Sequence, residues 1–266
     1  MENSTYLKNI GELVKSLMDN LILFGANFIN KHGLNITSKY KKDKDKFDLC
    51  LTLRDNVLYR AKSIRYHLLM LSNFEKSVTK QFMADQFDYK KRVDLMMYSV
   101  ETQLFLLDDI VFHLISLFDY IGNLIGFTYY GEHRIKIKWK GIVKWCKNAP
   151  LEKKKTGKIN VNNSLVSNLI LKYQQSLVYR LEEYRACLFH YGKDTTRSQA
   201  TINIMKPNES RVATEIPKDF QKWIKQFANV SEENEATLCH AAMWLVIESF
   251  TAANEIIMLL QKELKT

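Results

Sequence analysis

Residues 89–130 read YKKRVDLMMYSVETQLFLLDDIVFHLISLFDYIGNLIGFTYY. Apolar residues recur in this stretch at spacings of three and four, from Val93 through Leu104 and Leu107 to Ile121. That period is typical of one face of an α-helix. The second half of the stretch is apolar on nearly all sides, which predicts the central helix of a bundle.

Two further helices are predicted on the N-terminal side of this stretch. The first covers residues 5–31, where Leu7, Ile10 and Leu17 lie on one face and His32-Gly33 ends the helix. The second covers residues 47–78 with the same kind of apolar spacing. The charged run at 39–46 is predicted to be a polar loop between them.

On the C-terminal side, most of the predicted elements are again helices. A short helix is favoured around Trp139 and Cys146, although residues 135–139 also alternate like a strand. A helix at 164–190 follows, and short runs on both sides of Lys206-Pro207 predict the one β-hairpin, near 201–216. Helices at 218–227 and 231–265 complete the chain.

The composition supports an all-α fold. Nine glycines and three prolines in 266 residues are about 5%, too few for the many tight turns of a β-sandwich or barrel. Neither a G-x-G-x-x-G nor a G-x-x-x-x-G-K motif is present, which argues against dinucleotide-binding and P-loop enzymes. We expect a single helical domain over residues 1–266, with long central helices and at most one small hairpin.

No membrane segment is expected. The most apolar long stretch, residues 105–127, contains Asp108, Asp109, His113 and Asp119, which a lipid-spanning helix would not carry. The first residues lack a basic region followed by an apolar run, so no signal peptide is expected either.

The cysteines point to a reducing compartment. Cys50, Cys146, Cys187 and Cys239 are not spaced as pairs of metal ligands, and a chain of this size does not depend on disulfides. We expect reduced thiols in a cytoplasmic protein.

The positive charge is concentrated in one segment. Residues 132–160 hold ten basic and two acidic side chains, a net charge of +8, while the other 237 residues carry only +2. Interleaved Trp139 and Trp145 add rings that could stack on bases, although both could also be core residues. We expect this basic segment to bind RNA phosphates. Its cationic residues are Arg134, Lys136, Lys138, Lys140, Lys144, Lys147, Lys153, Lys154, Lys155 and Lys158.

One short motif could carry chemistry. Arg185 and His190 are separated by four residues near the end of a predicted helix. A histidine can move protons near neutral pH, and an arginine can hold a phosphate and stabilise the charge that builds on it. Arg60 and His67 form a second pair of this kind, but they lie mid-helix and are interpreted as a solvated face.

Arg185-x4-His190, followed by Tyr191-Gly192 after a long apolar helix, resembles the HEPN (higher eukaryotes and prokaryotes nucleotide-binding) superfamily. The phrase Phe118-Asp119-Tyr120 and its continuation to Gly126 also resemble a HEPN core helix. The resemblance covers about residues 89–195. It implies a small HEPN-like helical bundle, with helices 5–78 and the elements at 200–265 packed on it.

The resemblance also implies a function. Many members are metal-independent ribonucleases in toxin–antitoxin and antiviral defence systems, and they commonly act as homodimers. By this likeness His190 would be general acid and base, Arg185 the phosphate ligand, and Tyr191 an orienting neighbour. RNA and an antitoxin protein are the implied partners. A catalytically silent HEPN-like module that binds RNA or protein is the alternative, because Ala186 stands where many active members have a polar residue.

Acidic residues near the motif are expected to support it rather than bind metal. Asp119 and Asn123 lie one helical turn apart and could buttress the site or form core hydrogen bonds. The adjacent residues Asp108 and Asp109 point about 100° apart on a helix, which disfavours a shared metal ion. We therefore expect no metal site and no cofactor.

Overall fold

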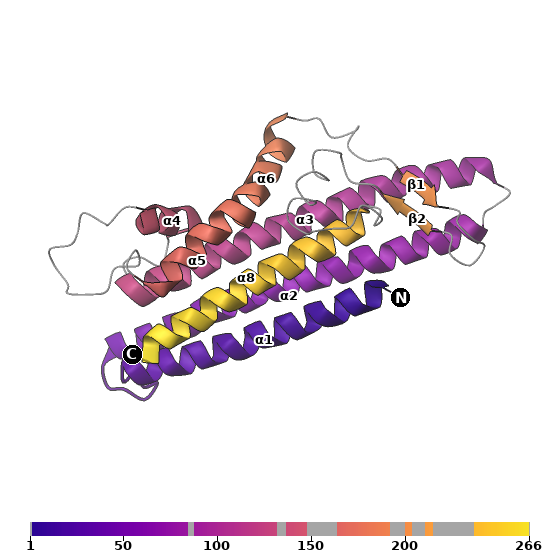
Figure 1. Cartoon of the computed structure of the whole chain (residues 1–266). Helices are drawn as coiled ribbons and strands as arrows, with labels where there is room; N and C mark the ends of the chain where they lie inside the picture. The colour runs from indigo at the N-terminus through magenta and orange to yellow at the C-terminus, as the bar shows by residue number, and fades with distance from the viewer. Residues whose placement is uncertain are drawn as a thin grey trace. The chain divides into compact units, whose positions relative to one another are not determined.

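The computed structural model of the chain describes residues 2–84, 88–131, 137–147, 164–191, 200–203, 211–214 and 237–265. Long α-helices account for most of them, so the predicted all-α class is confirmed (Figure 1). The elements are α1 (Glu2–Lys31), α2 (Lys41–Ala84), α3 (Tyr89–Tyr130), α4 (Trp139–Lys147), α5 (Leu165–Tyr173), a π-helical turn (Gln174–Val178), α6 (Tyr179–Tyr191), β1 (Ala200–Asn203), β2 (Arg211–Thr214) and α8 (Leu238–Lys265).

Helix α2 is longer than predicted. It begins at Lys41, inside the charged run 39–46 that we expected to be a loop, and it ends at Ala84. Lysine is a good helix former, and Asp43 adds a favourable negative charge to the first turn. The backbone N–H of Asp43 also donates to the carbonyl of Tyr40 at 3.1 Å. The prediction of a loop was therefore wrong from Lys41 onward.

The other helices agree more closely with the sequence pattern. Helix α3 has the predicted bounds, and α4 confirms the helical interpretation of the segment around Trp139. The helix predicted over 164–190 is present as α5, the π-helical turn and α6. The predicted helix at 218–227 and the predicted start of the last helix at Ser231 lie outside the described residues.

The chain divides into two compact units, each assembled from separate parts of the sequence. The first unit comprises residues 1–10, 63–112 and 183–247. The second comprises residues 11–62, 113–182 and 248–266. Helices α1, α2, α3, α6 and α8 each contribute residues to both units. The assignment of 1–266 as one domain with a core at 89–195 stays a prediction.

In the second unit, apolar helix faces form the core and a few buried amides align the helices. The rings of Phe28 in α1 and Phe127 in α3 lie 4.8 Å apart. The side-chain amide of Asn254 in α8 donates to the carbonyl of Leu13 at 3.1 Å and accepts from the amide of Asn20 at 2.9 Å. Since buried polar groups must be satisfied, these bonds fix α8 against α1 in one register.

In the first unit, a two-stranded antiparallel ribbon packs on α2. Strands β1 and β2 pair along their four residues each, which matches the hairpin predicted near 201–216. Val212 of β2 is buried with Val78 and Phe82 of α2. Its backbone N–H donates to the hydroxyl of Thr79 at 3.2 Å. Apolar burial and this hydrogen bond together attach the ribbon to the helix.

Residues 105–127 form the predicted core helix, since Leu114, Leu117, Phe118 and Ile121 are fully buried. Within the described ranges, α8 is the one helix whose length and composition would allow it to cross a membrane. Of its most apolar window, 61% is buried inside the fold, as in core helices that pass the same test. The absence of membrane association stays a prediction.

The described thiols are protected. Cys50, Cys146 and Cys239 are free and buried. Burial raises the pKa of Cys50 to about 11 and also raises the pKa of Cys146. Because the thiolate is the reactive form, burial lowers the reactivity of both thiols. The side chain of Cys187 lies outside the described residues.

Candidate functional site

The first unit holds Arg185 at the surface of α3. The guanidinium carbon of Arg185 lies 5.8 Å from the ring centroid of Phe112, and the arginine is exposed. The preceding residue, Tyr184, donates its hydroxyl to Asp108 Oδ1 at 3.0 Å. The contact of Arg185 with Phe112 and the hydrogen bond of Tyr184 to Asp108 together hold this part of α6 on α3. Arg185 therefore presents its positive charge to solvent from a fixed backbone.

His190 and Tyr191 belong to the same helix. Helix α6 continues through His190 and ends at Tyr191, whereas the side chains of both residues lie outside the described part of the chain. Positions five apart on an α-helix are separated by about 140° around its axis. The helical backbone therefore places positions 185 and 190 on different faces of α6.

The second Arg/His pair is packed rather than solvated. Arg60, in the second unit, donates to Nδ1 of His113 at 2.9 Å and lies over the ring of Tyr120. His67, in the first unit, is hydrogen-bonded through Nδ1 to the carbonyl of Ser63 at 2.8 Å, and its side chain is 21% exposed. The interpretation of Arg60 and His67 as a solvated face was therefore wrong. Both are half-buried groups with partners of their own.

The carboxylates of Asp108 and Asp109 have separate partners. Asp108 accepts from Tyr184, whereas Asp109 Oδ2 lies 3.8 Å from Nε2 of His67. The two carboxylates therefore have different partners, and the prediction that they share no metal ion stays a prediction. In the described ranges, no group of three or more His, Cys, Asp or Glu side chains could hold a metal ion. The prediction of a metal-free reaction stays a prediction.

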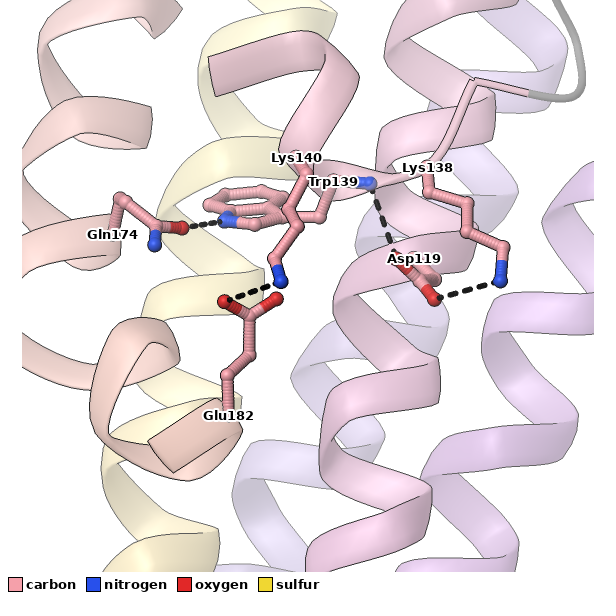
Figure 2. Close-up of polar contacts among 6 residues, drawn as sticks. All are labelled: Asp119, Lys138, Trp139, Lys140, Gln174 and Glu182. Carbon is pink, nitrogen blue, oxygen red and sulfur yellow. Dashed lines mark hydrogen bonds and ion pairs between the residues drawn. The ribbon is translucent and has the colours of Figure 1, made fainter. Parts of the chain in front are cut away.

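In the second unit, Asp119 anchors the start of α4. Its Oδ1 accepts from the backbone N–H of Trp139, the first residue of α4, at 3.1 Å (Figure 2). A carboxylate at a helix N-terminus also interacts favourably with the helix dipole. Gly122, one turn further along α3, permits this approach, since a Cβ there would lie 2.8 Å from the Trp139 nitrogen. Asp119 thus supports α4 directly. The prediction that Asn123 buttresses the motif stays untested.

Trp139 fixes α4 from the other side. Its indole N–H donates to the side-chain oxygen of Gln174 at 2.6 Å (Figure 2). Its ring also lies edge-on to the ring of Phe118, with the two centroids 5.1 Å apart. Gln174 is the first residue of the π-helical turn, a local widening that often marks functional segments. Trp139 is buried and Trp145 half-buried, 4.4 Å from the ring of Tyr130. Trp139 is therefore a core residue, and its ring is not accessible for stacking on an RNA base.

The described lysines of the basic segment differ in their surroundings. Lys138 Nζ lies 4.0 Å from Asp119, and Lys140 Nζ lies 3.5 Å from Glu182 (Figure 2). Both lysine side chains remain about three-quarters exposed, at 77% and 76%. Lys144 and Lys147 are exposed on the same helix. The other predicted RNA ligands lie outside the described residues: Arg134, Lys136, Lys153, Lys154, Lys155 and Lys158.

A further polar cluster in the second unit was missed from the sequence. The hydroxyl of Tyr173 donates to Glu255 Oε2 at 2.6 Å. Burial raises the pKa of Tyr173, and the bond to Glu255 raises it further; burial also raises the pKa of Glu248. Glu248 and Glu255 are seven residues apart on the apolar helix α8, so one face carries both. This seven-residue spacing of two acidic residues in an apolar helix is the feature of the sequence from which the cluster could have been predicted.

These contacts define two features. One is the exposed Arg185 on α6, with His190 five residues further along the same helix. The other is α4, which carries three of the predicted basic residues, Lys140, Lys144 and Lys147, and is fixed by Asp119, Gln174 and Glu182. Comparison of the chain with models of protein families, with curated proteins and with solved structures gives no match.

Proposed function

We propose that the chain is a metal-independent, HEPN-type endoribonuclease. The observation that carries this proposal is the setting of Arg185, an exposed guanidinium held on α3 by its own contact with Phe112 and by the Tyr184–Asp108 bond. An arginine on a rigid helix suits a phosphate ligand, because the planar guanidinium can donate two parallel hydrogen bonds to phosphate oxygens. His190, on the same helix, supplies an imidazole, the kind of side chain that can both accept and donate a proton.

The proposed reaction is attack of the RNA 2′-hydroxyl on the adjacent phosphorus. The 2′-oxygen loses its proton to a base as its bond to phosphorus forms, and the bond from phosphorus to the 5′-oxygen breaks as that oxygen gains a proton. Imidazole can perform either proton transfer, so His190 has the role of general acid or base. Arg185 stabilises the negative charge on the phosphorane oxygens. Tyr191 orients the histidine or stacks on a base.

A homodimer fits this arrangement. On one helix, positions 185 and 190 are about 140° apart, so Arg185 and His190 can reach the same phosphate in two ways. Either the end of α6 at Tyr191, next to His190, allows it within one copy, or two copies each contribute one of the residues across a dimer interface. We propose that the protein acts as a cytoplasmic homodimer in a toxin–antitoxin or phage-defence setting, with an antitoxin protein as its regulator.

The chemistry of the products tests the reaction directly. We expect incubation with unstructured RNA to give fragments with 2′,3′-cyclic phosphate and 5′-hydroxyl ends. The nucleophile is the 2′-oxygen of the RNA itself, so the phosphate stays on the upstream fragment and the 5′-oxygen leaves as a hydroxyl. EDTA should not change the rate. Mass spectrometry of the fragment ends measures the outcome. Fragments with 5′-phosphate ends, or cleavage that stops in EDTA, would overturn the mechanism.

A second candidate function rests on Ala186. This residue is exposed on α6 next to Arg185 and offers no side-chain polar atom to a bound phosphate. A module with this surface could bind RNA without cleaving it. Retention of intact RNA by the protein, with no cyclic phosphate at any time, would favour this function over the nuclease.

The salt dependence of RNA binding tests the basic segment. Replacing Lys153, Lys154 and Lys155 with Gln should flatten the slope of log affinity against log salt by up to about 2, because each phosphate contact with a single strand contributes about 0.7. The matched control replaces Lys41, Lys42 and Lys44, exposed lysines in the first turn of α2, and should leave the slope unchanged. Equal slopes in the two triple variants would remove the basic segment from the RNA interface.

A further inference from the structure

Helix α3 carries a repeated pair of residue types on one stripe. An acidic residue is followed four positions later by an aromatic one, and the pair recurs three times at intervals of seven. Residues spaced alternately four and three positions apart lie on one side of a helix, because seven residues complete nearly two turns. The direction in which they point rotates by only about 20° around the helix axis for every seven residues. The stripe therefore has a row of carboxylates beside a row of rings, all within the first unit. The pairs are Asp94 with Tyr98, Glu101 with Phe105, and Asp108 with Phe112.

The last of these pairs already has an occupant from the same chain. Asp108 accepts a hydrogen bond from the Tyr184 hydroxyl at 3.0 Å, and the Arg185 guanidinium lies 5.8 Å from the Phe112 centroid. The pair thus accommodates a cation at the ring and a hydrogen-bond donor at the carboxylate. This contact shows what chemistry the repeated unit recognises.

The two preceding pairs are exposed. Phe105 is 70% and Tyr98 is 58% exposed, and Glu101 and Asp94 are exposed as well. Met97, 64% exposed, adds a flexible apolar side chain next to Tyr98. Grouped large apolar side chains bordered by charge are typical of interaction sites rather than of ordinary monomer surface.

We propose that the pairs Asp94–Tyr98 and Glu101–Phe105 form a docking surface for a basic α-helix of another polypeptide. Charge complementarity selects the occupant: the carboxylates attract cations and repel phosphate, so this stripe is unsuited to RNA. The rings favour arginine, whose guanidinium both stacks on an aromatic face and donates hydrogen bonds to carboxylates. The proposal does not depend on the ribonuclease activity.

The geometry of the repeat specifies the spacing in the partner. Seven residues of helix rise about 10 Å, so the two open pairs lie about 10 Å apart along α3. A partner helix aligned with α3 meets both pairs when its arginines are seven residues apart. Arginines five apart lie on different faces of the partner, so only one can reach the stripe.

The test uses the full-length protein with 13C-labelled methionine methyl groups. The probe is an alanine-based helical peptide with two arginines seven residues apart; the matched peptide has the same composition with arginines five apart. We expect the first peptide at low salt to shift the NMR signal of Met97, assigned with Met97→Leu, and to leave the exposed Met258 of α8 unchanged. The matched peptide should bind about tenfold more weakly, because one cation–ring and carboxylate pair is lost.

Substitutions in the protein complete the test. Glu101→Lys replaces an exposed acid with a good helix former and should weaken binding of the first peptide about tenfold or more. Glu12→Lys, the same change at an exposed position of α1, should leave binding unchanged. Unshifted Met97, equal binding of the two peptides, or equal effects of Glu101→Lys and Glu12→Lys would each overturn the proposal. RNA cleavage is measured separately, so its presence or absence does not affect this outcome.

Discussion

His190→Ala should reduce the rate of RNA cleavage by about 10²–10⁴-fold, which is the usual contribution of general acid–base catalysis. Alanine is the best helix former and position 190 lies within α6, so we expect the secondary structure and the melting temperature to change little. A fluorogenic RNA substrate measures the rate, and circular dichroism measures the fold. Cleavage that survives His190→Ala would remove the histidine from the mechanism.

The second Arg/His pair provides a matched control. His67→Gln removes the imidazole from a motif of similar spacing, but that imidazole is bonded to Ser63 within α2 and lies 3.8 Å from Asp109. We expect the His67→Gln variant to cleave RNA at the same rate as the parent protein. Loss of cleavage in His67→Gln together with full activity in His190→Ala would transfer the assignment to the pair Arg60 and His67.

Mixing two inactive variants tests whether the site is shared between copies. In a dimer that takes Arg185 from one copy and His190 from the other, Arg185→Ala and His190→Ala subunits combine to leave one intact site. An equal mixture should then recover about a quarter of the parent rate, because half of the dimers are mixed and each has one working site of two. No recovery after subunit exchange would contradict the shared site.

The long helices could be predicted from sequence because their apolar faces are continuous. The bounds of α3 and the buried positions Leu107 and Ile121 follow from spacing alone. The start of α2 could not, because Lys41 to Lys46 offers no apolar face and its helix depends on intrinsic propensity and on the charge of Asp43 in the first turn. Where packing does not set the pattern, a charged helix and a charged loop have similar sequences.

Some features of the candidate site could likewise be predicted from local sequence, whereas others depend on the fold. The motif Arg185-x4-His190 and the helical character of α4 are visible locally. The π-helical turn at Gln174 and its bond to Trp139 are not, because the two residues are 35 positions apart and only the fold brings them together. The rings expected to stack on RNA include Trp139, which the fold instead buries.

Trp139→Ala should lower the free energy of unfolding by about 3–5 kcal/mol, the second large effect we expect. Trp139 is among the largest fully buried side chains, so its removal leaves a cavity beside Phe118. It also leaves the side-chain oxygen of Gln174 without the indole donor that it has in the native structure. Urea denaturation followed by far-UV circular dichroism measures the change.

Trp139→Phe separates the two contributions to this loss. Phenylalanine keeps most of the contact with Phe118 but has no N–H that could donate to Gln174. Trp139→Phe should therefore lower the free energy of unfolding by less than Trp139→Ala does, about 1–3 kcal/mol, through the lost hydrogen bond and the smaller ring. Because Lys144 and Lys147 are carried by α4, loosening this helix should also weaken RNA binding in proportion to the lost stability. A Trp139→Ala variant as stable as the parent would show that α4 is not held by Trp139. RNA binding unchanged in a clearly destabilised variant would show that the basic face of α4 is not part of the RNA interface.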